Sequence, residues 1–384
     1  MALINKLSAI GDAIREKTGK DDLLTLDQMP EEIKGISGGG EEIEPIVLSG
    51  NCTYACAGPL SGEFIKLHGD KISTKDVSHM TSMFRSNTTV AEIPFVINAS
   101  NTWGSCEQMF ADAYYLKKPP KIKGTHSLQT SNYYQGVLLT NMFNNCYSLQ
   151  EFPEDFFKDM CGEDYWASSE PYTSNRSYLF SNCVSLRKSP KGLEYLLNSP
   201  TGYSSHLYYK LFDNCYFLEE IELPVKDIKL PTSALNSVCT NCSRLTHFKF
   251  QTNEDGSPKV ITTWTNPQTL NLNLMGRAGQ AYYITNNTKY HGVGDEKKVY
   301  DDVSYQALKN DPDWWTNNTY YARYNHDSAV ETINTLPDVI ATGVAHTVLF
   351  TGDCGLYTDG GAIKTLTEEE IAVATNKGWT ISIS

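Results

Sequence analysis

Apolar residues recur in a fixed order along residues 83–250. Each copy carries an apolar residue followed by Phe, three residues to Cys or another short side chain, three more to Leu or Val, and then an apolar residue or Pro. The anchors of the copies, spaced 26 to 37 residues apart, are Phe84, Phe110, Phe143, Phe180, Phe212 and Cys239. Repetition at such spacings indicates supersecondary units that stack on one another.

One such unit is too short to bury its own apolar face, so each unit must pack against its neighbours. The Asn145-Cys146 pair, which recurs in the later copies, predicts a turn, because Asn tolerates left-handed backbone geometry. The Leu and the apolar residue after it predict a short strand, and the following Pro limits strand pairing on one side. The pattern therefore predicts stacked coils with an extended surface, which is typical of binding proteins.

Four cysteines share one position of the repeat, and we expect them to form a column of reduced, buried side chains: Cys146, Cys183, Cys215 and Cys242. Cys239 and Cys242 form a C-x-x-C that alone could indicate redox or zinc chemistry. Both belong to the repeat, however, and no second ligand pair follows, so we predict no metal and no cofactor. Cys52 and Cys56 precede the first full copy, and we interpret them as packing at the end of the stack. Free thiols fit synthesis in a reducing cytoplasm, since the N-terminus lacks the apolar region of a secretory signal.

Residues 1–36 are predicted to form a separate helical segment. Its seam has the 4-3-4 spacing of a coiled coil and consists of Leu3, Leu7, Ile10 and Ile14. A glycine-rich linker at 37–49 separates it from the repeats. A helical segment of this length cannot hold a core of its own. We therefore expect it to bind further copies of itself or another protein; the alternative is a cap folded against the repeats.

Residues 252–384 are predicted to continue the repeats, with an aromatic-rich insertion at about 276–326 and a C-terminal cap. The pattern predicts a helix over 327–334, a strand at 348–350, a helix after Thr367 with Glu370 in its capping box, and a strand from Trp379. Four aromatic residues of the insertion are candidates for stacking on a ligand: Trp314, Trp315, Tyr320 and Tyr321. The alternative is that they pack inside a satellite core.

Net charge, the lengths of apolar runs and the absence of catalytic motifs argue against several classes of function. The net charge of −13 argues against nucleic acid as a partner, and no apolar run is long enough for membrane insertion. The chain contains no G-x-S-x-G, H-E-x-x-H or P-loop motif. The acidic residues at 301–302 and at 311 and 313 could supply paired carboxylates for glycoside hydrolysis, but acidic residues at turns are more often solvated. We therefore predict that the chain is not an enzyme.

Two stretches resemble known families. The run MFNNCYSLQEFP at 142–153 resembles the BspA-like leucine-rich repeats of bacterial surface proteins and phage virion proteins, and the likeness covers residues 50–251. The run LSAIGDAIREKTGKDDLLTLDQMPEEIKGI at 7–36 resembles N-terminal segments of phage tail, baseplate and fibre proteins. The C-terminal helix and strand are similar to the last repeat and cap of phage-borne members.

These resemblances imply an α/β repeat fold, a leucine-rich-repeat solenoid with a short N-terminal helical anchor. They imply a virion structural protein, made in the host cytoplasm, whose residues 1–36 bind other virion proteins and form a homo-oligomer. The repeats would then be an adhesin for a host-surface glycan or protein. Two alternatives stay open: a structural or decoration fibre of the capsid or tail with no receptor of its own, and a surface-polysaccharide depolymerase.

Overall fold

The computed structural model describes residues 45–99, 106–123, 139–161, 177–197, 208–242, 244–272, 324–350 and 366–383, and the backbone of three further strands between 283 and 300. Two compact units divide the chain, residues 1–46 and residues 47–384. The predicted helical segment 1–36 lies outside the described residues, as does most of the predicted insertion 276–326.

The second unit consists mainly of short strands joined by turns. The strands are β1 (Ile46–Asn51), β2 (Ile72–His79), β3 (Ile97–Asn98), β4 (Ile122–Lys123), β5 (Glu220–Leu223), β6 (His247–Phe250), β7 (Thr269–Leu272), β8 (Tyr283–Thr285), β9 (Thr288–His291), β10 (Lys298–Tyr300), β11 (His346–Phe350) and β12 (Trp379–Ile383). The described helices are α3 (Gly58–His68), α4 (Phe156–Cys161), α7 (His326–Thr335) and α8 (Glu368–Thr375), with 3₁₀ turns η1 (Gly69–Lys71), η2 (Leu193–Leu197) and η5 (Ile340–Thr342).

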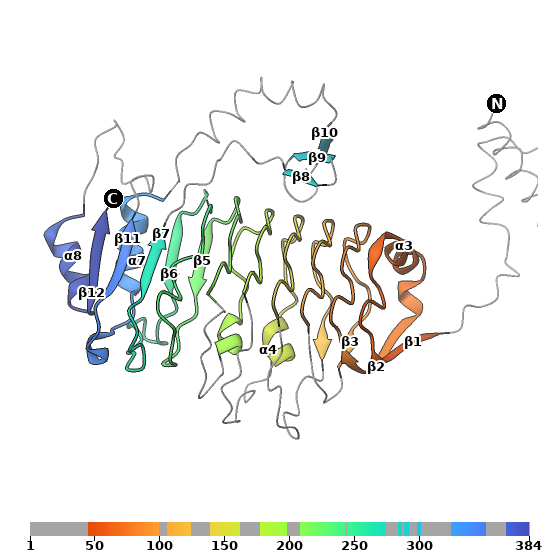
Figure 1. Ribbon diagram of the computed structural model, residues 1–384, viewed down its shortest axis with the longest axis horizontal. Coiled ribbons are helices and arrows are strands. Elements are labelled where there is room, and N and C mark those ends of the chain that lie inside the picture. Colours follow the sequence, from red (N-terminus) through yellow and green to blue (C-terminus); the bar gives the residue numbers. More distant parts are fainter. Residues whose placement is uncertain are drawn as a thin grey trace, which may run out of the picture. The chain divides into compact units, whose positions relative to one another are not determined.

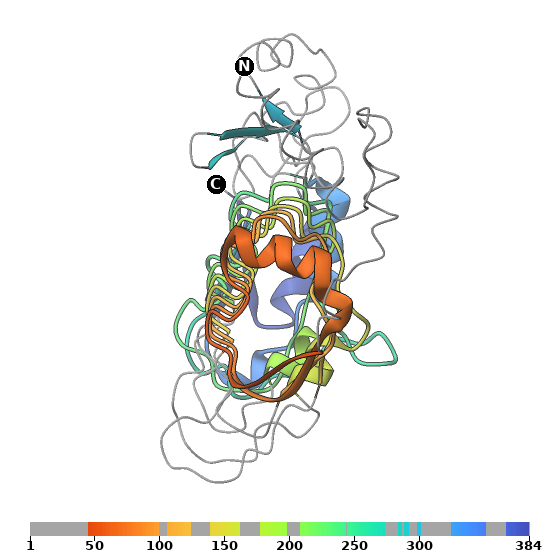
Figure 2. The ribbon, with the colours of Figure 1, turned by 90° about the vertical axis from the view of Figure 1, so that its right-hand side faces the viewer.

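Strands from successive coils pair in parallel. The parallel pairs are β3 with β4, β5 with β6, and β11 with both β7 and β12, whereas β8, β9 and β10 form a small antiparallel sheet. Figure 1 shows the coils side by side from β1 to β12, and Figure 2, which looks from the β1 end, shows them superposed around a shared interior. Parallel pairing between successive coils allows each unit to bury its apolar face against the next unit.

In the turn that carries each Phe, the backbone N–H groups donate hydrogen bonds alternately to the next coil and within their own coil. The N–H of Phe84 donates to the carbonyl of Met109 in the next coil at 2.8 Å, whereas the N–H of Met83 donates to Met80 in its own coil at 3.1 Å. The same alternation recurs in the following coils, as far as the turn around Phe212. Every second N–H therefore links neighbouring coils, and no regular helix is needed to satisfy this backbone.

Asparagine fixes the shape of these turns, as the sequence predicted. The Asn residues of the repeated Asn-Cys pair have φ between 59° and 62°, namely Asn145, Asn182, Asn214 and Asn241. Their side chains also link coils, because the Asn182 amide donates to Asn145 Oδ1 at 2.9 Å and the Asn241 amide donates to Asn214 Oδ1 at 2.6 Å. Asn thus supplies both the left-handed turn and a hydrogen bond along the stack.

A continuous column of phenyl rings forms the centre of the stack. Neighbouring rings are nearly parallel, with centroids 5.2 to 5.7 Å apart, and the members are Phe84, Phe110, Phe143, Phe180 and Phe212, each at most 1 % exposed. Cys239 follows at the far end, as its anchor position predicted. At the near end the Cys56 N–H donates to Met83 at 2.8 Å, just as Phe84 donates to Met109. Residues 52–58 therefore form an additional coil that the repeat pattern missed, with Cys56 in the position of the Phe.

The repeated cysteines are buried and reduced, which confirms the predicted column. Each thiol also has a hydrogen bond that the sequence did not predict. The Sγ atoms of Cys146, Cys183 and Cys215 donate to the Phe carbonyl of the preceding coil at 3.0, 3.2 and 3.0 Å, and Cys242 does the same at 3.1 Å. Burial raises the pKa of the Cys183 and Cys215 thiols. The column therefore consists of neutral thiols that act as small hydrogen-bond donors.

The C-terminal elements confirm the local predictions. Helix α8 begins after Thr367 and has the predicted capping box, since the Glu370 N–H donates to Thr367 Oγ1 at 3.2 Å and Glu370 Oε2 accepts from the Thr367 N–H at 2.7 Å. Helix α7 covers the predicted 327–334, β11 contains 348–350, and β12 begins at Trp379. The buried Trp379 indole donates to the carbonyl of Pro337 at 2.8 Å. These residues close the core at the β12 end of the stack.

Candidate ligand-binding furrow

Charged residues form a row along the strand face of the stack. Each member is the second residue after the Leu or Val of its repeat. Acidic and basic residues alternate along the row, whose members are Glu92, Lys118, Glu151, Lys188, Glu220 and His247. Backbone bridges place Glu92 beside Lys118 and Lys188 beside Glu220, and β5 and β6 place Glu220 beside His247. Acidic and basic side chains therefore alternate from one coil to the next.

Ion pairs connect neighbours in this row. Lys118 Nζ lies 3.7 Å from a Glu151 carboxylate oxygen, and Lys188 Nζ lies 2.8 Å from that of Glu220. These side chains are 41 to 72 % exposed, so each pair stabilises the fold by less than about 1 kcal/mol. The alternation also avoids like charges directly opposite each other on neighbouring coils, which would be destabilising.

Two adjoining grooves run across the coils beside this row, and we call them together the furrow. The first has a volume of about 440 Å³ and lies between residues 92–96, 118–121 and 153–154. The second has a volume of about 650 Å³ and lies between residues 150–155 and 186–195. Both are lined by Pro153 and Glu154, so the two grooves adjoin at these residues and together span four coils.

Proline explains why the surface is hollow at this point. The repeat places a proline in each of these coils, and all of them line the furrow: Pro94, Pro120, Pro153 and Pro190. Glu92 and Lys118 pair two residues before these prolines, and pairing resumes only at Ile97 and Ile122. Because Pro has no N–H to donate, the ladder cannot continue through this position. The ladder is therefore interrupted between the two paired stretches. The sequence predicted this limit on pairing but not the groove.

Exposed polar groups line the furrow on both sides. Lys121 and Lys191 supply cationic donors, and Glu154 and Asp155 supply anionic acceptors. Tyr195 adds an aromatic ring, with Lys158 Nζ 6.0 Å from its centroid. Donors, acceptors and a ring spread over four coils suit an elongated ligand that is rich in hydroxyl or amide groups.

A second aromatic cluster lies on another row of the coils. The rings of Tyr114 and Tyr147 stack with centroids 5.0 Å apart. Further along the row, the ring of Phe217 lies 5.2 Å from the guanidinium of Arg187 and 4.4 Å from that of Arg244. Tyr147 also packs against a small cluster that includes Phe217. These rings contact one another between coils, so we assign them to packing.

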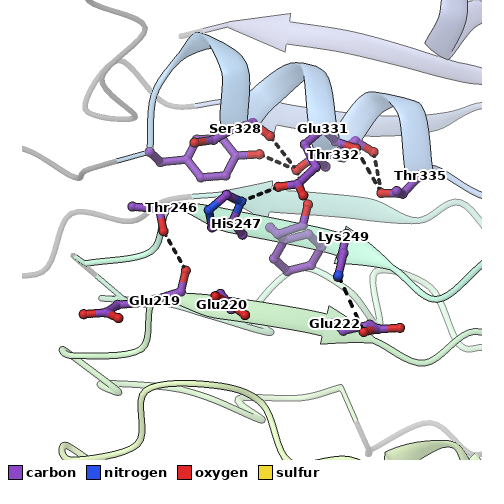
Figure 3. A network of polar contacts seen from close by, with 12 residues as sticks. Glu219, Glu220, Glu222, Thr246, His247, Lys249, Ser328, Glu331, Thr332 and Thr335 are labelled. Carbon is purple, nitrogen blue, oxygen red and sulfur yellow. Dashed lines mark hydrogen bonds and ion pairs between the residues drawn. The ribbon is translucent and has the colours of Figure 1, made fainter.

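A polar network joins α7 to the strands of the stack (Figure 3). His247 Nδ1 lies 2.8 Å from Glu331 Oε2, the N–H of Phe250 donates to Thr335 Oγ1 at 3.1 Å, and the Thr332 hydroxyl donates to the carbonyl of Phe248. Tyr324 contacts the same Thr332 hydroxyl. Because these groups satisfy one another between α7 and β6, the network fixes the helix on the sheet.

The predicted site residues lie outside the part of the chain that the structure describes. This holds for Trp314, Trp315, Tyr320 and Tyr321 and for the seam Leu3, Leu7, Ile10 and Ile14. Among the described residues, no cluster of His, Cys, Asp or Glu has the arrangement of a metal site, and no helix is long and apolar enough to cross a membrane. The furrow was not predicted, although two signals in the repeat could have indicated it: the recurring Pro and the alternating charge two residues before it.

Comparison of the chain with protein-family models, with curated proteins and with solved structures found no match.

Proposed function

We propose that the chain is a phage virion protein that displays a leucine-rich-repeat adhesin toward the host surface. Support for the virion assignment is the resemblance of residues 7–36 to attachment segments of tail, baseplate and fibre proteins. Support for the repeat class is the resemblance of the repeat to BspA-like sequences, together with the regular columns of Phe, Cys and Asn. The observation that favours binding most is the furrow, whose two adjoining grooves together span four coils.

In this proposal the parts of the chain have separate roles. Residues 1–36 attach to other virion proteins and associate with further copies of the chain, and the repeats extend away from that attachment. The ligand is an extended host-surface chain, either a glycan or a peptide strand, lying along the furrow. The chain itself carries out no catalysis and needs no cofactor.

Removing two exposed lysines of the furrow tests the role of the groove. Purified full-length chain is labelled with a fluorophore and incubated with intact cells of a panel of bacteria, and bound fluorescence is measured. The double variant Lys121→Ala, Lys191→Ala should lose at least about tenfold in affinity, since each lost charge-assisted hydrogen bond costs about 1.5–3 kcal/mol. Lys75→Ala is the matched control, because Lys75 is an exposed lysine of β2 that lines neither groove.

Three results would contradict the proposal. If the double variant binds cells as well as Lys75→Ala does, the furrow is not the site. If unmodified protein binds no cell in the panel although it assembles into particles, the structural or decoration role is favoured. Release of reducing sugar from host envelopes by the purified chain would favour the depolymerase instead.

The predicted aromatic insertion is a second candidate for the site, and its test is independent of the furrow. If Trp314 and Trp315 contact the ligand, Trp314→Ala and Trp315→Ala should reduce cell binding with little change in melting temperature. If they pack in a core, the melting temperature should fall strongly, and binding should decrease only as the fold is lost.

A further inference from the structure

Helix α3 (Gly58–His68), at the β1 end of the stack (Figure 2), has two faces of different character. One face is held against the next coil. A Cβ on Gly62 would lie 1.9 Å from Thr89 Oγ1, and one on Gly69 would lie 2.4 Å from Pro94 Cγ, while Ile65 between them is 2 % exposed. The two glycines are therefore required for close approach of the backbone to that coil.

The opposite face carries three large apolar side chains in solvent. Leu60 is 87 % exposed, Phe64 is 42 % exposed and Leu67 is 72 % exposed. Their 4-3 spacing places them on a single stripe about half a turn away from Gly62, Ile65 and Gly69. An apolar stripe that points away from the fold to which it belongs is typical of an interaction surface.

We infer that this stripe, Leu60, Phe64 and Leu67, packs against the same stripe of a second copy of the chain. The spacing is that of a two-turn coiled-coil seam, with Leu60 and Leu67 at the d position and Phe64 at the a position. Glu63, whose carboxylate oxygen lies 3.0 Å from Lys66 Nζ of the same helix, then occupies a g position, and His68 occupies the following e position; these two positions face each other between the helices of a parallel pair. A carboxylate and an imidazole in that arrangement can form a hydrogen bond, so the flanks of the stripe are compatible with self-association.

The stripe is too small to form a stable interface unless residues 1–36 already hold the two chains together. Three side chains bury far less than the about 800 Å² per partner of a standard interface, so the stripes cannot hold two free chains together. The inference therefore rests on the proposed oligomerisation through residues 1–36. Residues 37–45 join that segment to β1, which precedes α3, and a linker of this short length gives an effective concentration in the millimolar range. At that concentration a weak apolar contact is occupied.

Disulfide trapping in the full-length chain tests this contact. A single exposed cysteine is introduced by Leu67→Cys, the protein is oxidised with copper phenanthroline at about 10 µM, and covalent dimer is measured on a non-reducing gel. The parent chain gives the background from its own cysteines, of which Cys52 and Cys56 next to α3 are at most 5 % exposed. Val260→Cys is the matched control, because Val260 is 61 % exposed and is not in α3.

Ile10→Lys disrupts the predicted seam of residues 1–36. Covalent dimer should form on the order of 100-fold faster with Leu67→Cys alone than with Leu67→Cys and Ile10→Lys together. This factor is the ratio of a millimolar effective concentration to the protein concentration of about 10 µM. Val260→Cys should give no more dimer than the parent. If light scattering shows an oligomer but Leu67→Cys forms dimer no faster than Val260→Cys, the stripe is not an interface, whereas oligomerisation through 1–36 stands. If the full-length chain is monomeric, both the α3 interface and oligomerisation through residues 1–36 are refuted. The cell-binding assay tests the adhesin role separately.

Discussion

The phenyl column makes a quantitative prediction for the Phe180→Ala variant. Phe180 is fully buried, with stacked rings of Phe143 and Phe212 at 5.7 and 5.4 Å and edge contacts to Phe152 and Phe157 at 5.7 and 6.1 Å. Truncation of a buried Phe costs about 3–5 kcal/mol, and each lost aromatic pair adds about 0.5–1.5 kcal/mol beyond buried area. We therefore expect a loss near the upper limit, about 5 kcal/mol of unfolding free energy.

Phe212→Ala is the matched comparison, because its ring is equally buried but stacks on Phe180 on one side and is followed by Cys239 on the other. It should cost about 3.5 kcal/mol, because among the described rings Phe212 has three aromatic pairs fewer than Phe180, each taken at the lower limit of about 0.5 kcal/mol. Equilibrium urea unfolding of both variants, followed by circular dichroism, measures the difference. A Phe180→Ala variant within 1 kcal/mol of the parent, or a Phe212→Ala variant that is the less stable of the two, would refute the stacking argument.

Three further outcomes are expected. Cys183→Ala should cost about 1–2 kcal/mol in urea unfolding, since it removes a buried thiol and its hydrogen bond to the Phe143 carbonyl; an unchanged value would mean that this hydrogen bond contributes nothing to stability. Burial lowers the pKa of His346 below its ordinary 6.5, so the unfolded state binds the proton more readily, and stability should be full above about pH 6.5 and fall as the pH decreases through that value. Melting temperatures at pH 7 and pH 5 measure this fall, which His346→Gln should reduce. Deletion of residues 1–36 should leave a folded repeat unit that no longer enters particles, and truncated chain recovered in particles would disprove the attachment role.

Some of the fold could be predicted from the sequence because the relevant forces are local. The left-handed turn at Asn182 follows from the tolerance of Asn for positive φ. The start of α8 follows from the reciprocal bonds of Thr367 and Glu370. Burial of Cys183 follows from the regular position it shares with other small side chains. In each case a few adjacent residues determine the outcome.

The features that sequence reasoning missed depend on residues far apart in the chain. The coil at 52–58 lacks a Phe, so only its hydrogen bonds to the next coil identify Cys56 as an equivalent of Phe84. The furrow arises where prolines about thirty residues apart come together and interrupt the ladder. The exposed stripe of α3 depends on which face Gly62 presents to the neighbouring coil. None of these arrangements follows from the order of residues within one repeat.

The alternation of backbone hydrogen bonds in the turns has a mechanical consequence. Half of the N–H groups in each turn donate along the stack to the next coil, as Phe84 does to Met109, so these bonds are nearly parallel to the stacking direction. A tensile load applied to the first coil therefore opens one set of inter-coil bonds at a time, rather than shearing a whole sheet at once. The stack would extend coil by coil under load, and each released coil would add length before the next one carries the tension.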